Sequence, residues 1–153
     1  MQLSLDAAMG HTFSVAEFAA LINELLGHTF PHDLWIQGEV RDLSRARSGH
    51  VYFTLVDPTD QAGRSADAQV NVVLFEQTKH QVNAHIKRTG NGMRIDDGVS
   101  IRIRGVPEFY APQGRLNLRM TAIDPEYTLG QLTASRDRLL RVLADEGLLA
   151  RNA

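Results

Sequence analysis

Two runs of alternating residues that flank a short loop, within residues 34–57, constrain this chain more than any other feature. One apolar set is Leu34, Ile36, Gly38 and Val40, and a second is Val51, Phe53 and Leu55. Successive side chains of a strand point to opposite faces, so this period of two predicts two half-buried strands of a curved antiparallel sheet. A short segment, residues 45–50, joins them as a loop.

The residues that this register turns outward are suited to one kind of ligand. Tyr52 lies between two inward residues, and Phe75 takes the same outward face at the end of a third predicted strand. The loop carries Arg45, Arg47 and His50 beside a Ser-Gly pair. Aromatic rings on a sheet face stack bases, and guanidinium groups at its rim hold phosphates. The pattern therefore favours binding of single-stranded nucleic acid.

The remaining chain supplies the other elements of a small barrel. A helix follows Thr12 or Ser14, with Glu17 in capping-box spacing, and ends near Gly27. Strands are predicted over residues 34–41, 51–56, 69–75, 99–110 and 115–124, with helices over 77–88 and 129–149. The order of helix, three strands, helix, two strands and helix predicts a mainly β fold, the five-stranded Greek-key barrel known as the OB-fold. We divide the chain into a flexible leader (1–11), the OB-fold domain with its N-terminal helix (12–127) and a helical linker (128–153).

In such a barrel the binding face centres on strands two and three and on the loops that join strands one to two and four to five. The candidate nucleic-acid-binding residues are Arg41, Arg45, Arg47, His50, Tyr52, Phe75, Arg102, Arg104, Phe109, Tyr110 and Arg115. The net charge of -2 excludes a globally basic binder, so attraction to phosphate needs a local patch. The span from Trp35 to Arg119 provides one, because its twelve basic and nine acidic residues give a net charge of +3.

Several functions have no support in the residues. The chain has no cysteine, which excludes disulfides, thiolate catalysis and cysteine-ligated metal centres. His28 and His32 are four residues apart, but Pro31 prevents a continuous helix between them. No motif typical of a hydrolase, a metalloprotease or a nucleotide-binding loop is present. We therefore expect no catalytic residue, no metal site and no cofactor. We also expect a cytoplasmic protein, because no signal peptide or membrane-spanning run is present.

Alternatives remain open for each candidate. The aromatic pair could lie under a neighbouring domain, the basic loop could be merely solvated, and the outward arginines of the last two strands could form the wet side of an antiparallel sheet. At the level of function, a tRNA anticodon-binding OB module and a protein-interaction barrel compete with a single-stranded DNA binder.

The motifs Leu34-Trp-Ile-Gln-Gly-Glu-Val and Ser48-Gly-His-Val-Tyr-Phe-Thr-Leu-Val-Asp57, with Val73-Leu-Phe75, make the chain resemble the N-terminal domain of the exodeoxyribonuclease VII large-subunit family. The resemblance covers residues 12–149. It implies the OB domain of a bacterial nuclease that degrades single-stranded DNA from both ends into oligonucleotides. Its implied partners are single-stranded DNA, a catalytic domain of the same polypeptide and the exodeoxyribonuclease VII small subunit.

The chain also departs from this pattern. Its residues contain no counterpart of the family's catalytic motifs, so we expect a fragment that binds DNA and does not cut it. Residues 63–67 and 90–93 look like loop insertions, and Asn71 stands where the resemblance implies a basic residue.

Overall fold

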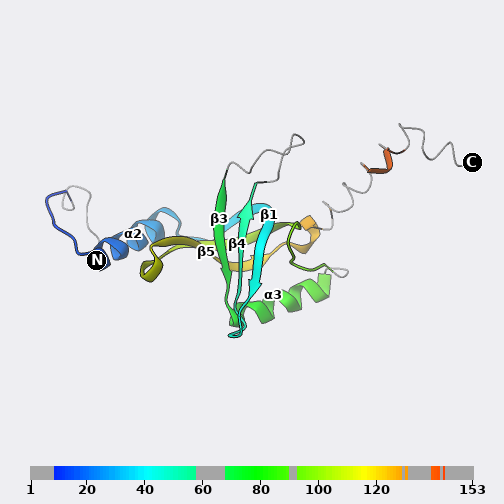
Figure 1. The fold of residues 1–153 in the computed structure, drawn as a ribbon, viewed down its shortest axis with the longest axis horizontal. Coiled ribbons are helices and arrows are strands. Elements are labelled where there is room, and N and C mark those ends of the chain that lie inside the picture. The colour runs from blue at the N-terminus through cyan, green and yellow to red at the C-terminus, as the bar shows by residue number, and fades with distance from the viewer. Residues whose placement is uncertain are drawn as a thin grey trace, which may run out of the picture.

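The five strands of the computed structural model close into a barrel (Figure 1). The structure describes residues 9–57, 68–89, 93–128, 130, 139–141 and 143. Most of the predicted leader and of the predicted tail helix over 129–149 lies outside these residues, as do the expected insertion at 63–67 and most of the one at 90–93.

The order of the strands around the barrel is that of an OB-fold. The strands are β1 (Leu34–Arg45), β2 (Val51–Val56), β3 (Gln69–Leu74), β4 (Ser100–Tyr110) and β5 (Arg115–Ile123). They are arranged as β1-β2-β3-β5-β4, and β4 pairs with β1 to close the barrel. The β3–β5 pair is parallel and the others are antiparallel. The predicted fold is confirmed.

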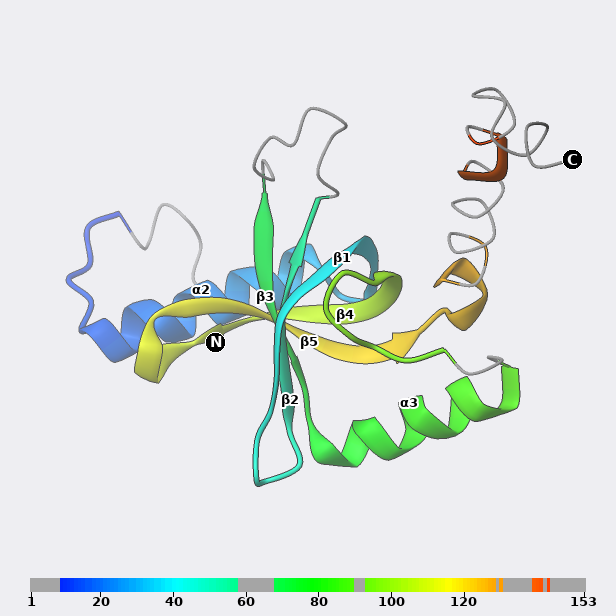
Figure 2. The ribbon, with the colours of Figure 1, turned by 45° about the vertical axis from the view of Figure 1, so that its right-hand side comes forward.

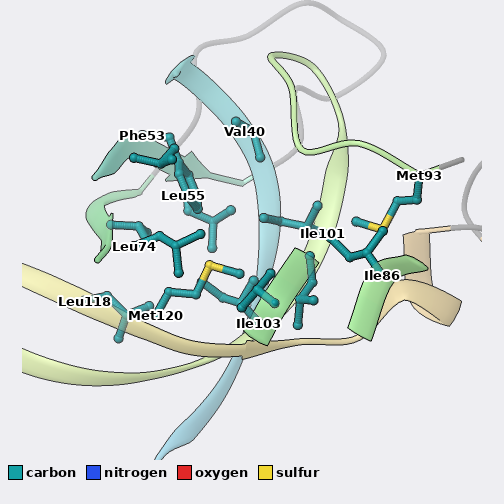
Figure 3. Packing of buried hydrophobic residues seen from close by; sticks show 14 residues of the cluster. Val40, Phe53, Leu55, Leu74, Ile86, Met93, Ile101, Ile103, Leu118 and Met120 are labelled. Atoms are coloured by element: carbon teal, nitrogen blue, oxygen red, sulfur yellow. The ribbon is translucent and has the colours of Figure 1, made fainter. Parts of the chain in front are cut away.

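The core confirms the period-two pattern. Inward residues of several strands meet inside the barrel, where Val40, Ile101, Ile103 and Met120 are fully buried (Figure 3). In β2 the alternation is sharp, because Phe53 is 3% exposed while Tyr52 is 44% exposed. Close approach of the strands also requires a glycine at one point. A Cβ atom on Gly38 would lie 2.7 Å from the carbonyl oxygen of Val56.

Two helices flank the barrel, α2 (Val15–Thr29) and α3 (Glu76–Thr89). Ser14 and Glu17 form the predicted capping box at the start of α2, which continues two residues beyond Gly27. The helix lies along the β4–β5 hairpin (Figure 2). There the Asn23 amide donates to the carbonyl of Phe109 at 3.0 Å and accepts from its N–H at 2.8 Å.

The two helices bury different amounts of their apolar surface. In α2 the buried residue is Ala19, while Val15, Phe18 and Leu25 are each more than half exposed. The apolar residues that recur along α2 therefore do not all reach the core. In α3, by contrast, the predicted inner residues Val82 and Ile86 pack into the hydrophobic core beneath the barrel.

The first strand is longer than the sequence predicted. The pairing of β1 with β2 shifts between Arg41 and Ser44, and Asp42 has a positive φ of 54°. One extra residue is thus accommodated as a β-bulge, and β1 continues to Arg45, which pairs with Val51. The prediction that Arg45 belongs to the loop was wrong. The turn itself is short: Ala46 N–H donates to the His50 carbonyl, and Gly49 has a φ of 93°.

After β5 the chain enters a helical turn at residues 125–128. Asp124 caps this turn, since its carboxylate accepts from the N–H groups of Glu126 and Tyr127. Thr128 is 1% exposed and donates its hydroxyl to the carbonyl of Ser100 at 2.8 Å. These contacts attach the turn to the start of β4.

Candidate nucleic-acid interface

A concave surface lies on the outer face of β2, β3 and β5, beside the β4–β5 hairpin. We call it the aromatic cleft. Its volume is about 440 Å³, and its lining residues are Asp42, Tyr52, Phe53, Thr54, Asn71, Val72, Val73, Phe75, Tyr110, Gln113, Arg115 and Asn117.

Three exposed aromatic side chains from three different parts of the fold line the cleft. Tyr52 is 44% exposed on β2, Phe75 is 38% exposed just after β3, and Tyr110 is 49% exposed at the end of β4. Val73 also lines the cleft and is only 6% exposed, although its register is outward. The cleft thus has an apolar floor and aromatic walls, an arrangement on which bases can stack.

Phe75 does not belong to the third strand, as the sequence had predicted. The strand β3 ends at Leu74, and Phe75 lies in the one-residue connection to α3. Its ring packs edge-to-face against His50, with ring centroids 5.1 Å apart. Tyr52 and Phe75 nevertheless lie on the same cleft.

His50 has a structural contact. Its Nδ1 accepts a hydrogen bond of 3.0 Å from the N–H of Glu76, the first residue of α3. This N–H is one of those that a helix start leaves without an intrahelical partner. His50 therefore caps α3 and supports the ring of Phe75, and it does not itself line the cleft.

Polar groups of the cleft come from adjacent strands. Asn71 on β3 is paired in register with Asn117 on β5, and the Thr54 hydroxyl lies 3.4 Å from the Asn71 side-chain oxygen. Amides both donate and accept hydrogen bonds, so they can contact base edges of any kind. The sequence predicted neither Thr54 nor Asn117 as a site residue. Their outward register was the available signal, but it is shared by every second residue of the sheet.

The candidate arginines divide among different surfaces. Arg115 lines the cleft and is paired in register with Tyr110 across the β4–β5 hairpin. Among the described residues of the lining, it is the one with a cationic side chain. Arg41 forms an ion pair with Glu39 at 3.4 Å. Arg47 is exposed in the β1–β2 turn. Arg45 lies on the opposite side of the hairpin, away from the cleft.

Arg102 and Arg104 lie on the β1–β4 wall and do not line the aromatic cleft. Their guanidinium groups stand 4.6 Å and 5.7 Å from the centre of the Trp35 ring. Each also pairs with a carboxylate, Arg102 with Asp124 at 3.4 Å and Arg104 with Asp33 at 3.7 Å. On this wall, two arginines whose charges are balanced by carboxylates therefore lie against the exposed Trp35 ring.

The backbone of Phe109 forms the two hydrogen bonds with Asn23, and Phe109 does not line the cleft. Within the described part of the chain, no three side chains of the metal-ligating types gather in one place. The described helices include none that is long and apolar enough to cross a membrane.

A closed barrel of this strand order, with a cleft of exposed aromatic and amide groups over β2, β3 and β5, defines an oligonucleotide-binding type of domain. The chain belongs to the family of OB-fold nucleic acid binding domains, whose model matches residues 13–124.

Curated relatives are similar over most of the chain. The chain is 33% identical over 117 residues to the exodeoxyribonuclease 7 large subunit of Pseudomonas savastanoi pv. phaseolicola. This match covers 76% of this chain and 22% of the relative. The chain is 31% identical over 149 residues to the protein of the same name from Pseudomonas fluorescens, and that match covers 97% of this chain and 28% of the relative. The chain thus spans about a quarter of the length of these relatives, and the resemblance inferred from the motifs is confirmed.

Solved structures with a similar arrangement include two single-stranded DNA binding proteins. The mitochondrial protein of S. cerevisiae is 13% identical, with a TM-score of 0.41 over 61% of this chain and 94% of that one. The protein of Mycoplasma pneumoniae is 13% identical, with a TM-score of 0.39 over 60% and 90%.

Proposed function

We propose that this domain binds single-stranded DNA in the aromatic cleft. The observation that carries the proposal is the convergence of Tyr52, Phe75 and Tyr110 around the apolar floor at Val73. Each ring that stacks on a base contributes about 1–3 kcal/mol, whatever the base sequence. Arg115 at the rim supplies a cation for the phosphate backbone.

The shape of the cleft favours a single strand over a duplex. Its exposed aromatic rings can stack only on bases whose faces are free. In a duplex those faces are already stacked on neighbouring base pairs. The amides of Asn71 and Asn117 add hydrogen bonds of either polarity, which suits a binder without strong sequence preference.

The similarity to exodeoxyribonuclease 7 large subunits supports a more specific role. In this proposal the domain is the DNA-binding part of such a subunit in the bacterial cytoplasm. It holds a single strand for a catalytic domain of the same polypeptide, and the small subunit joins the assembly elsewhere. The domain itself binds DNA, uses no cofactor and does not cut.

A titration with fluorescent oligo-dT tests the proposal, with a duplex of equal length and a tRNA anticodon stem-loop as competitors across a salt series. We expect the single strand to bind most tightly and to weaken as salt rises. Preference for the stem-loop would instead indicate an anticodon-binding module. Absence of binding to all three would leave the barrel as a protein-interaction domain.

A further inference from the structure

A second groove lies on the other side of the β1–β2 hairpin, against α3. We call it the basic groove. Its volume is about 340 Å³, and its lining residues are Leu43, Arg45, Val51, Leu74, Lys79, Asn83, Ile86, Lys87, Met93, Arg94 and Ile95. Four of these residues are cationic and none is acidic. Its floor is formed by apolar side chains of the core and its edge.

From this groove we infer a second binding subsite, which takes the phosphate backbone of the same single strand that occupies the aromatic cleft. The inference rests on the proposed function and extends it. Four cations line the groove, against the one carboxylate of Asp97 that accepts from the N–H of Leu43 at its edge, so positive charge is in excess here in a chain whose net charge is -2. A polyanion is the ligand that such an excess attracts.

The cations of the groove are of two kinds. Arg45 donates through Nη2 to the carbonyl of Ile95 at 3.3 Å, and Lys79 donates through Nζ to the carbonyl of Gly49 at 3.4 Å. These bonds connect the hairpin to α3 and to the segment that precedes β4, which are the elements that line the groove. Each of these two side chains keeps further donors for a phosphate.

Lys87 and Arg94 complete the cationic lining from α3 and from the segment before β4. Both are exposed, and neither side chain makes a hydrogen bond or an ion pair within the described part of the chain. Among the described residues, no existing contact competes with phosphate oxygens for their donors.

Continuity with the aromatic cleft argues for the same polynucleotide as the occupant. Neighbouring residues of one wall face opposite grooves: Asp42 and Leu43 on β1, Tyr52 and Val51 on β2, and Phe75 and Leu74 at the end of β3. The hairpin is thus a shared partition between the two grooves, and the exposed Arg47 lies in its turn. A strand that leaves the cleft around the hairpin meets cations on the far side.

Oligo-dT of two lengths tests this inference on the whole chain. OB-folds engage about 4 to 16 nucleotides, so an oligonucleotide of about 5 fits the cleft alone and one of about 15 can reach both grooves. The variant is the double substitution Lys87→Ala and Arg94→Ala. The matched control is Arg88→Ala, an exposed cation on the same helix that does not line the groove.

For the long oligonucleotide, we expect the double variant to flatten the slope of log K against log salt by about 1.4, since each lost phosphate contact removes about 0.7. The short oligonucleotide should bind the variant and the wild type equally, and Arg88→Ala should change neither slope. An unchanged slope for the long oligonucleotide overturns the second subsite, as does an equal loss for both lengths. Failure of the wild type to bind even the short oligonucleotide would instead refute the proposed function.

Discussion

Two adjacent residues of β2 separate binding from stability. Tyr52 lines the aromatic cleft and is 44% exposed, whereas Phe53, although it also reaches the cleft lining, is 3% exposed and belongs to the core. Tyr52→Ala removes one stacking platform, so we expect a loss of about 1–3 kcal/mol in binding of single-stranded DNA, which is about 5- to 150-fold in Kd. Phe53→Ala leaves a cavity in a close-packed core and should lower the free energy of unfolding by about 3–5 kcal/mol.

Fluorescence anisotropy with labelled oligo-dT measures the first effect, and urea unfolding of the same preparations measures the second. Tyr52→Phe serves as the control, because it keeps the ring and should retain most of the affinity. The reasoning fails if Tyr52→Ala binds DNA as the wild type does while it loses stability. It fails equally if Phe53→Ala is as stable as the wild type, because the side chain would then not fill the barrel.

Four further predictions address the turn, a glycine, a carboxylate and catalysis. Arg47→Ala should flatten the salt slope of DNA binding by about 0.7, equally for all base sequences, and an unchanged slope would show that the turn is merely solvated. Gly38→Ala should lower the free energy of unfolding, measured in urea, by about 1–3 kcal/mol, because its Cβ would meet a backbone carbonyl of β2. Its control is Gly27→Ala on α2, where a Cβ meets open space and should raise the free energy of unfolding by about 0.5–1 kcal/mol. The backbone hydrogen bond from Ser14 lowers the pKa of Glu17. The contribution of this carboxylate to folding stability should therefore be present above its unfolded pKa and be lost as pH falls through its folded pKa. An ordinary pKa for Glu17 in an NMR titration would contradict this cap. The purified chain should leave labelled single-stranded DNA intact with or without divalent metal. A DNA-degrading activity that follows the protein through purification would show that an active site had been missed.

The parts of the fold that followed from sequence are those governed by local rules. The period of two in β2 predicted which side chains enter the core, because one buried face fixes the register of a strand. The spacing of Ser14 and Glu17 predicted the start of α2 for a similarly local reason. In α2 the apolar spacing indicated an amphipathic helix, but it could not show that Val15 and Phe18 remain exposed. Burial depends on what packs against a helix, which spacing does not encode.

The candidate site was predictable only in part, because ion pairs join residues that are far apart in the sequence. Arg102 and Arg104 were predicted to bind DNA because they face outward in β4. In the folded chain their carboxylate partners are Asp124, which follows β5, and Asp33, which precedes β1. Neither acid belongs to the strand that carries the arginines, so inspection of that strand alone gave no sign of the pairing.

The bulge at Asp42 explains why the basic residues of the first hairpin separate. Before the bulge, Gly38 and Val40 face the core, and uninterrupted alternation would place Arg45 on the outer face with Arg41. The extra residue inverts this parity, so that Leu43 packs against the core and Arg45 pairs with the inward Val51. Aspartate tolerates the positive φ that this bulge requires better than most residues do. One backbone irregularity therefore places an arginine in the basic groove rather than at the aromatic cleft, and it makes the hairpin a partition with a different chemistry on each side.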